Sequence, residues 1–277
     1  MGINDEIEKI VSGRWIAGEY ISDVVKLSKE LNHKGVKSQI NYLGELFTDI
    51  RDVRDATNTY AMLIDEISKN KIKAHISIKL SQLGMLIDHN ILEDNYASIV
   101  RMAKKKGIFV WMDMEEEQFV DKEIELYLAY VKSGNVGICI QSYMKRSIKD
   151  VVRIVNKKGV VRLVKGAYYT PKNHVYLDRP AATKNYLKIM NYLFTKANKF
   201  MVATHDINLV DAALYANKKY RRDVEYSMLN GINNKYIINL AKAGESTSLY
   251  LPFGRKWIDY SFRRLKEIGN IRLITGL

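Results

Sequence analysis

Short apolar runs alternate with longer amphipathic segments along most of this 277-residue chain, and this alternation strongly restricts its fold. The eight apolar runs are VKSQINYLG, AHISIKLSQLG, IFVWMDME, VGICIQSYM, VVRLVKGAY, FMVATHD, VEYSMLNG and SLYLPFG. Segments of helical length, such as 94–107, 147–159 and 185–199, separate most of them. A strand followed by a helix, repeated in this way, predicts a parallel sheet closed into a (β/α)8 TIM-type barrel. An open, doubly wound sheet is the alternative that the pattern leaves open.

Two helical segments, about 4–12 and 19–33, precede the first apolar run. The second of them places apolar residues close to the helical period, at Ile21, Val24, Val25, Leu27 and Leu31. With 3 prolines and 16 glycines, the chain has no linker-rich stretch that would divide it. We therefore expect one domain over 1–277, with N-terminal helices in about 1–34 and the barrel in about 35–277.

Cysteine usage and hydropathy indicate the compartment. The chain has one cysteine, Cys139, so no disulfide framework is expected and a reducing, cytoplasmic environment is favoured. The opening residues Met-Gly-Ile-Asn-Asp-Glu lack the apolar core of a signal peptide. No apolar run reaches the roughly 18 residues needed to span a bilayer.

The net charge of +13 is consistent with three interpretations. A solvated lysine-rich shell, an anionic membrane surface and nucleic acid each fit a basic chain. No nucleic-acid-binding signature accompanies the charge, so no nucleic-acid partner is expected. The expectation that remains beside the solvated shell is peripheral contact with the inner face of the cell membrane.

Polar residues stand where the predicted strands end. In barrels of this kind the carboxyl ends of the strands carry the functional site. A charge within an apolar strand is costly unless it is paired or functional. An internal ion pair, for example between Lys79 and Asp113, would account for two of the charged residues at these strand ends. Polar residues at six strand ends that converge on one face of the barrel instead predict a functional site. These residues are Lys79, Asp113, Gln141, Arg162, Lys165, Thr204, His205 and Tyr250.

Several common kinds of site are not indicated. The five histidines lack metal-ligand spacing, so no metal is expected. The chain has no Gly-x-Ser-x-Gly, no P-loop and no Gly-x-Gly-x-x-Gly. Lys165 and Gly166 do bring a cation and a permissive backbone to a strand end, which suits a phosphate or a flat ring.

A second cluster lies near the C-terminus, in the run WIDYSFRR at 257–264. Helical spacing would place Tyr260, Arg263 and Arg264 on one side of a helix. Two guanidinium groups beside an aromatic ring predict a clamp for a small carboxylic acid.

The run RLVKGAYY at 162–169 resembles the fifth-strand motif of the flavin-dependent proline dehydrogenase family. The resemblance extends over nearly the whole chain from about residue 14. It includes the blocks KLSQLG, DMEE, IQSYMKR, ATHD, EYSMLNG and YLPFG…YSFRR, in the family's order. From the length, the aldehyde dehydrogenase half of the family's bifunctional members is expected to be absent.

This resemblance implies FAD-dependent oxidation of L-proline to 1-pyrroline-5-carboxylate, the first step of proline catabolism, with electrons passed to a quinone. Two alternatives remain: oxidation of another small cyclic or N-alkyl amino acid, and a basic barrel without catalytic activity.

The resemblance also implies roles for individual residues. Arg263 and Arg264 would bind the carboxylate of proline, with Lys79 on its other side. Leu163, Tyr250 and Tyr260 would wall the pyrrolidine ring. Arg162, near the flavin N5, and Asp113, in the substrate-side polar network, would be the catalytic residues. FAD would contact Met114, Gln141, Arg162, Val164, Lys165, Gly166, Thr204 and His205.

Overall fold

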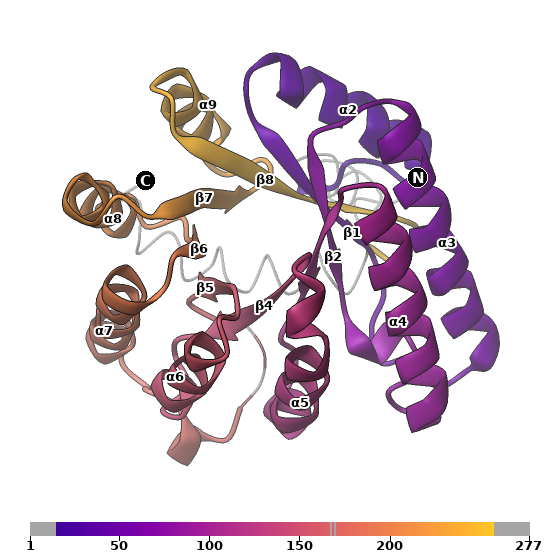
Figure 1. The fold of residues 1–277 in the computed structure, drawn as a ribbon, viewed down its shortest axis with the longest axis horizontal. Coiled ribbons are helices and arrows are strands. Elements are labelled where there is room, and N and C mark those ends of the chain that lie inside the picture. The colour runs from indigo at the N-terminus through magenta and orange to yellow at the C-terminus, as the bar shows by residue number, and fades with distance from the viewer. Residues whose placement is uncertain (1–14, 167, 169, 258–277) are drawn as a thin grey trace, which may run out of the picture.

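The computed structural model describes residues 15–257 apart from 167 and 169. Eight parallel strands form a closed barrel in chain order (Figure 1). The barrel closes where the first and last strands pair, from Lys37 opposite Ser248 to Tyr42 opposite Phe253. This closure excludes the open sheet and confirms the predicted barrel. The strands are β1 (Lys37–Tyr42), β2 (Ala74–Ile78), β3 (Phe109–Met112), β4 (Val136–Gln141), β5 (Val161–Val164), β6 (Lys199–Ala203), β7 (Asp223–Leu229) and β8 (Ser246–Phe253).

The α-helices lie outside the barrel (Figure 1). The helix predicted at 19–33 is confirmed as α2, whereas the segment 4–12 and the residues Tyr260, Arg263 and Arg264 lie outside the described residues. The described helices are α2 (Ile21–His33), α3 (Ile50–Lys69), α4 (His89–Lys105), α5 (Val120–Tyr130), α6 (Ser147–Asn156), α7 (Arg179–Lys196), α8 (Ile207–Tyr220) and α9 (Asn234–Lys242). Short 3-10 turns are η1 (Leu80–Gln82), η2 (Glu117–Phe119), η3 (Val131–Ser133) and η4 (Lys172–His174).

Several helices begin at an aspartate. The side chains of Asp49, Asp88 and Asp178 accept hydrogen bonds from backbone N–H groups in the first turns of α3, α4 and α7. These amides have no partner within the helix, so each cap stabilises its helix by about 0.5–2 kcal/mol. Because the strands are parallel, the capped ends lie at the same end of the barrel as the carboxyl ends of the strands.

The opposite helix ends are basic and turn through the left-handed region. Glycine is the residue that usually takes this position. At the ends of α3, α6 and α8, however, Lys71, Lys158 and Arg221 take it, with φ of 52°, 59° and 50°. A side chain there costs roughly 1–2 kcal/mol relative to the right-handed region.

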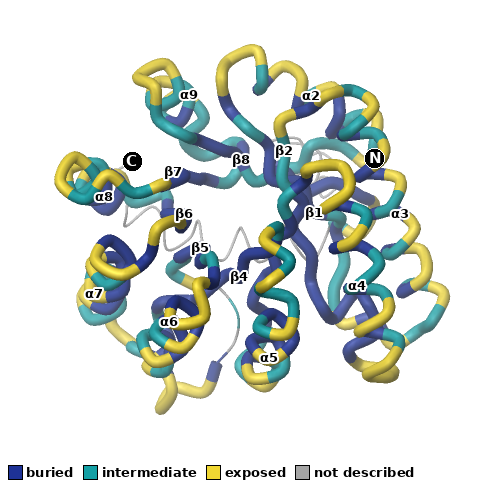
Figure 2. Tube along the Cα trace, in the orientation of Figure 1, coloured by how far each residue is buried: buried dark blue, intermediate teal, exposed yellow. Residues whose placement is uncertain are grey.

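Apolar residues pack between the sheet and the helices, and Figure 2 shows the strands buried and the outer helix faces exposed. The barrel interior is more polar. Gln39 Nε2 donates to the hydroxyls of Ser227 and Ser248, and its Oε1 accepts from Arg162. At the amino end of the strands, Glu225 pairs with Lys37 Nζ at 2.8 Å and with His75 Nε2 at 3.1 Å. Burial alone would raise the pKa of Glu225, but its contacts with His75 and with the Lys37 ammonium hold the pKa well below its usual value.

Candidate active site

Arg162 on β5 lies at the centre of the polar site, and only 4% of its surface is exposed. Its Nη1 donates to Gln39 Oε1 at 2.8 Å and to Ser77 Oγ at 3.0 Å, while Nη2 pairs with the Asp113 carboxylate. Burial would lower the pKa of Arg162, but the Asp113 charge outweighs it and the pKa is raised. The guanidinium therefore remains a fixed cation inside the barrel.

Asp113 joins Arg162 to Tyr250. It follows β3, where its backbone N–H donates to the carbonyl of Ile78 at 2.8 Å. Its Oδ1 also accepts from Ser77 Oγ at 2.6 Å, and its Oδ2 accepts from the Tyr250 hydroxyl at 2.8 Å. The Arg162 guanidinium lies 5.7 Å from the centre of the Tyr250 ring. Three predicted residues from three strands thus form one hydrogen-bonded unit.

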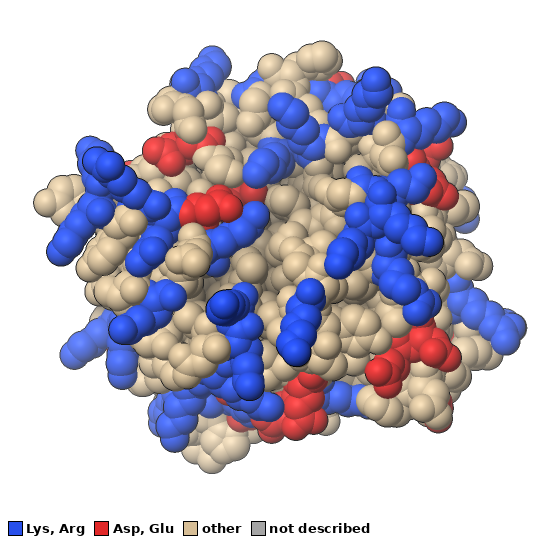
Figure 3. Space-filling view, viewed as in Figure 1, with Lys and Arg blue, Asp and Glu red and all other residues tan. Residues whose placement is uncertain are grey.

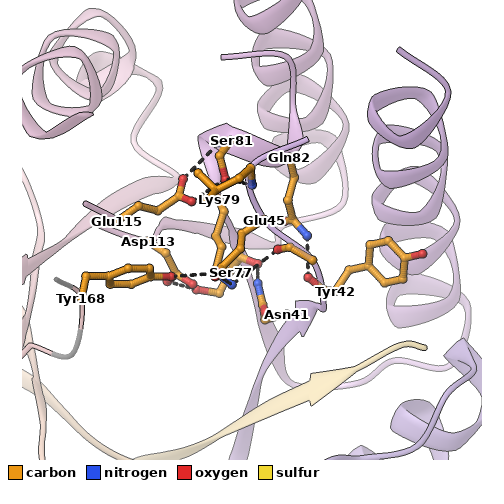
Figure 4. A network of polar contacts seen from close by, with 12 residues as sticks. Asn41, Tyr42, Glu45, Ser77, Lys79, Ser81, Gln82, Asp113, Glu115 and Tyr168 are labelled. Carbon is orange, nitrogen blue, oxygen red and sulfur yellow. Dashed lines mark hydrogen bonds and ion pairs between the residues drawn. The ribbon is translucent and has the colours of Figure 1, made fainter. Parts of the chain in front are cut away.

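Lys79 lies beside this unit but has a different partner from the one suggested by the sequence (Figure 4). The internal ion pair between Lys79 and Asp113, which was the alternative explanation for these two charges, does not form, since Asp113 pairs with Arg162. Lys79 Nζ pairs with Glu45 Oε2 at 3.1 Å, and Tyr168 donates to the same oxygen at 3.1 Å. Glu45 follows β1, and no residue of this strand end was among the predicted site residues. The strand-end rule, applied to β1, would have found it.

Glu115 and Glu123 are two buried acids that the sequence patterns did not identify. Glu115 accepts from the backbone N–H of Ser81 at 3.0 Å and from its hydroxyl (Figure 4). Burial raises its pKa to about 7, although nearby Lys79 acts in the opposite direction. Glu123 on α5 accepts from the Glu115 backbone N–H at 3.0 Å, and burial together with the Glu115 charge raises its pKa well above the usual value. Glu115 stands in the DMEE block and Glu123 on α5, and neither position in the sequence indicated burial.

The residues predicted to contact a flavin lie along adjoining strand ends. Gln141 ends β4 opposite Val164 of β5, and Gln141 Nε2 donates to the Glu115 carbonyl at 2.8 Å. Thr204 and His205 follow β6, and His205 Nε2 accepts from the Leu229 N–H at 3.4 Å. Met114, directly after Asp113, is buried at the neighbouring end of β3.

Lys165 and Gly166 follow β5 on the same arc. Lys165 Nζ pairs with Asp206 Oδ2 at 2.7 Å and remains partly exposed. Gly166 has φ of 113°, and a Cβ there would lie 2.1 Å from the Tyr143 ring, so the chain requires glycine at this point. The arc thus offers a partly exposed cation, a backbone without a side chain, and polar strand ends. This donor set fits a flavin, which combines a flat ring with polar edges and, in FAD, a pyrophosphate.

Leu163, a predicted site residue, does not face the barrel interior. It is fully buried, and its carbonyl accepts from the Tyr186 hydroxyl of α7 at 3.2 Å. Side chains alternate along a strand, so the inward direction of Arg162 places Leu163 on the outer, helix-facing side of β5. Its predicted contact with a substrate ring receives no support from this position.

Gln39 and Ser77 are additional residues of the site, and both contact the Arg162 guanidinium. Within the described part of the chain, no group of three or more His, Cys, Asp or Glu side chains is placed to hold a metal ion. Nor does any described helix combine the length and apolar character needed to cross a membrane.

The geometry defines a class: a (β/α)8 barrel with a buried cation, a shared carboxylate and a flavin-compatible arc at the carboxyl ends of its strands. A family model described as proline dehydrogenase matches residues 24–272. The chain therefore belongs to the proline dehydrogenase family, which is a family of flavin-dependent oxidoreductases.

Individual relatives agree with this assignment. Proline dehydrogenase of Deinococcus radiodurans is 31% identical over 92% of this chain and 85% of its own length. Proline dehydrogenase 2 of Bacillus subtilis is 27% identical over 94% of this chain and 87% of its own length. The structure of proline utilization A from Bdellovibrio bacteriovorus superimposes with a TM-score of 0.86 at 22% identity. It covers 94% of this chain and 33% of that longer chain, and at this identity the likeness concerns the fold alone.

Proposed function

We propose that this protein oxidises L-proline to 1-pyrroline-5-carboxylate with FAD as cofactor, the first step of proline catabolism. The observation that carries the proposal is the Arg162–Asp113–Tyr250 unit, buried at the carboxyl ends of three barrel strands in a member of this family. Bound flavin would supply the hydride acceptor. Arg162, Lys165 and the ends of β4, β5 and β6 would hold it.

The remaining residues bind and orient the substrate. Lys79 supplies one cation for the proline carboxylate, and Arg263 and Arg264, outside the described residues, would supply two more. Fixing the carboxylate fixes the position of the ring, which is a proximity effect. The Asp113 carboxylate holds the Tyr250 hydroxyl and the Arg162 guanidinium in one arrangement, so neither has to reorganise during the reaction.

Flavin absorbance of the purified protein provides the direct test. The visible flavin bands should be present, should bleach on anaerobic addition of L-proline, and should not bleach with an unrelated amino acid. Acid precipitation should release all the colour as FAD. A colourless protein that proline leaves unchanged when FAD is added would refute the proposed function.

A quinone is the acceptor that we propose for the reoxidation of the flavin, with the protein cytoplasmic and in peripheral contact with the membrane. The support is the family's use of quinones together with the net charge of +13. A water-soluble short-chain quinone should sustain turnover with proline. If the enzyme oxidises proline with an artificial dye as acceptor but with none of the quinones tested, a quinone is not its acceptor.

If Arg263 and Arg264 bind the proline carboxylate, removing one of them should weaken substrate binding without affecting flavin binding. Arg264→Met should raise the proline KM about tenfold or more while the flavin spectrum stays unchanged, because a charge-assisted hydrogen bond contributes roughly 1.5–3 kcal/mol. Steady-state kinetics and absorbance provide the two measurements. Arg255→Met is the matched control, since Arg255 is exposed and pairs with Glu19 at 3.7 Å. An unchanged KM for Arg264→Met would place the carboxylate elsewhere.

Tyr250 predicts a preference for proline over 4-hydroxyproline. A packed aromatic wall leaves little room for an added oxygen, and overpacking costs about 1–3 kcal/mol, or roughly 5- to 150-fold in kcat/KM. Tyr250→Ser should narrow the preference mainly by losing activity with proline. Tyr250→Phe, which removes only the hydroxyl bound to Asp113, should keep it. Comparable kcat/KM values for both substrates in the parent enzyme would rule out the ring as the determinant.

A further inference from the structure

Tyr143 lies two residues after the end of β4 and contacts the β5–α7 connection, which begins with Lys165 and Gly166 of the flavin-compatible arc. Its backbone N–H donates to the Lys165 carbonyl at 2.9 Å, and its carbonyl accepts from the Tyr176 N–H at 2.9 Å. The ring of Tyr143 fills the space that a Cβ at Gly166 would need. One residue thus holds the connection near both of its ends.

The hydroxyl of Tyr143 holds the middle of the same connection. It donates to the Tyr168 carbonyl at 2.6 Å and lies 2.6 Å from Thr170 Oγ1. Because the phenol proton goes to the carbonyl, the threonine hydroxyl is the donor of the second bond. Burial raises the pKa of Tyr143, so the phenol stays protonated and remains a donor. Thr170 is buried as well, which limits the replacement of this bond by water.

Tyr168 joins the connection to the substrate side of the site (Figure 4). Its hydroxyl donates to Glu45 Oε2 at 3.1 Å, and the same oxygen pairs with Lys79 Nζ at 3.1 Å. A hydrogen bond donated to a carboxylate offsets part of its negative charge, so Tyr168 weakens the hold of Glu45 on Lys79. Lys79 is a cation proposed above for the proline carboxylate. The position of Tyr168 therefore affects how strongly this cation attracts the substrate.

We propose that Tyr143 is a positioning residue that fixes the β5–α7 connection for both flavin binding and proline binding. Its backbone and ring place Lys165 and Gly166 at the flavin-compatible arc, and its hydroxyl places Tyr168 against Glu45. Tyr143 acts through these residues rather than on the reacting atoms. The inference rests on the proposed function, since the cofactor and the substrate are those named there.

Removing the Tyr143 hydroxyl should weaken binding more than it slows the chemical step. Arg162 is held inside the barrel by Gln39, Ser77 and Asp113, none of which belongs to the connection. Tyr143→Phe should raise the Kd of FAD about tenfold, because two hydrogen bonds of the connection are lost. Flavin fluorescence released on dilution of the FAD-loaded enzyme measures this Kd. At saturating FAD, the proline KM should rise about threefold or more while kcat with a soluble acceptor changes less than about twofold.

Tyr127 provides the matched control, at the amino end of β5. Its side chain is fully buried, and its hydroxyl accepts from the Val160 N–H at 2.8 Å and lies 3.4 Å from the Val160 carbonyl. Tyr127→Phe should lower the thermal midpoint at least as much as Tyr143→Phe, but it should leave the Kd of FAD and the proline KM unchanged. Equal increases in both variants would reduce the effect to a general loss of stability and would overturn the proposal.

Thr170→Val breaks the bond to Tyr143 from the other side with little change in volume. It should raise the Kd of FAD about threefold, which is less than the effect of Tyr143→Phe because the bond to the Tyr168 carbonyl remains. The double variant should equal Tyr143→Phe alone, since the bond between the two side chains is already absent. Additive effects would show that the two residues act separately and would refute this step of the argument.

Limited proteolysis of the FAD-loaded enzyme tests the connection independently of catalysis. Trypsin cleaves after lysine and arginine, and Figure 3 shows such side chains exposed over much of one face, so the first cut reports which backbone opens. Lys172 is exposed within the connection. Cleavage after Lys172 should be about tenfold faster in Tyr143→Phe than in the parent, and unchanged in Tyr127→Phe.

The outcomes separate this inference from the proposed function. If the parent binds FAD and oxidises proline while Tyr143→Phe keeps the parent's Kd for FAD and its rate of cleavage, the role of Tyr143 is refuted and the proposed function stands. A parent enzyme that binds no FAD would refute both.

Discussion

Replacing Asp113 with alanine is expected to lower the free energy of unfolding by about 3–5 kcal/mol, because the buried charge of Arg162 would lose its counterion. Gln39 and Ser77 would still accept hydrogen bonds from the guanidinium, but neither carries a charge. Urea denaturation of the flavin-loaded protein measures the change. The activity with proline should fall as well, since Tyr250 and Arg162 would lose the carboxylate that they share.

The double variant Asp113→Ala with Arg162→Met separates a lost charge pair from a cavity. Removing both charges leaves no uncompensated ion, so the double variant should be more stable than Asp113→Ala alone. Asp113→Asn, which keeps the volume, should lie between the parent and the alanine variant. Equal instability of the single and double variants would show that packing around Asp113, rather than its charge, maintains the site.

Replacing Glu115 with glutamine is expected to stabilise the protein at pH 8 relative to the parent, but not at pH 5. The pKa of Glu115 is raised from 4.5 to about 7 in the folded state, so the folded protein holds this proton more tightly than the unfolded chain. Stability from this group falls as the pH rises from 4.5 to about 7 and then stays low. At about 1.36 kcal/mol per unit, the difference is roughly 3 kcal/mol. Glutamine does not ionise, and it can accept from the Ser81 N–H and donate to the Ser81 hydroxyl.

The measurement is the free energy of unfolding of both proteins at pH 5 and pH 8. The variant should gain roughly 2.5 kcal/mol on the parent between these two pH values, since part of the full difference is already present at pH 5. Glu125→Gln, at an exposed position on α5, is the control and should differ from the parent by less than about 0.5 kcal/mol at either pH. A constant difference between Glu115→Gln and the parent across this range would mean that Glu115 ionises in the folded protein as freely as in the unfolded chain.

The alternation of apolar runs and helices was sufficient to predict the barrel, because each strand and helix carries its own period and the connections are short. The same reasoning found Asp113, Arg162 and Tyr250, since a polar residue near the end of an apolar strand is conspicuous in the sequence. It did not find Gln39 and Ser77, which also contact Arg162. Gln39 lies within β1, and its bond to Arg162 crosses the barrel interior between strands that are not neighbours.

The direction of side chains and the burial of acidic residues were two further features that the sequence did not predict. Neighbouring residues of a strand point to opposite faces of the sheet. Arg162 and Leu163 therefore cannot both face the barrel interior, although the resemblance to the family implied a role in the site for each of them. The run of acidic residues after Asp113 is typical of an exposed loop, yet Glu115 is buried beneath Ser81. Such burial depends on the path of the loop between β3 and α5, which no period in the sequence specifies.

The pairing of β1 with β8 also has a consequence for synthesis on the ribosome. Strand β1 is translated first, but its partner at Ser246–Phe253 emerges after nearly all of the described chain. Until then β1 presents an open sheet edge, and such edges invite pairing with other chains. The hydroxyl of Ser248, which binds Gln39 at 2.8 Å, arrives equally late. The interior around Arg162 is therefore completed only at the end of translation, and a nascent chain shortened by a few tens of residues has the helices of a barrel without its closure.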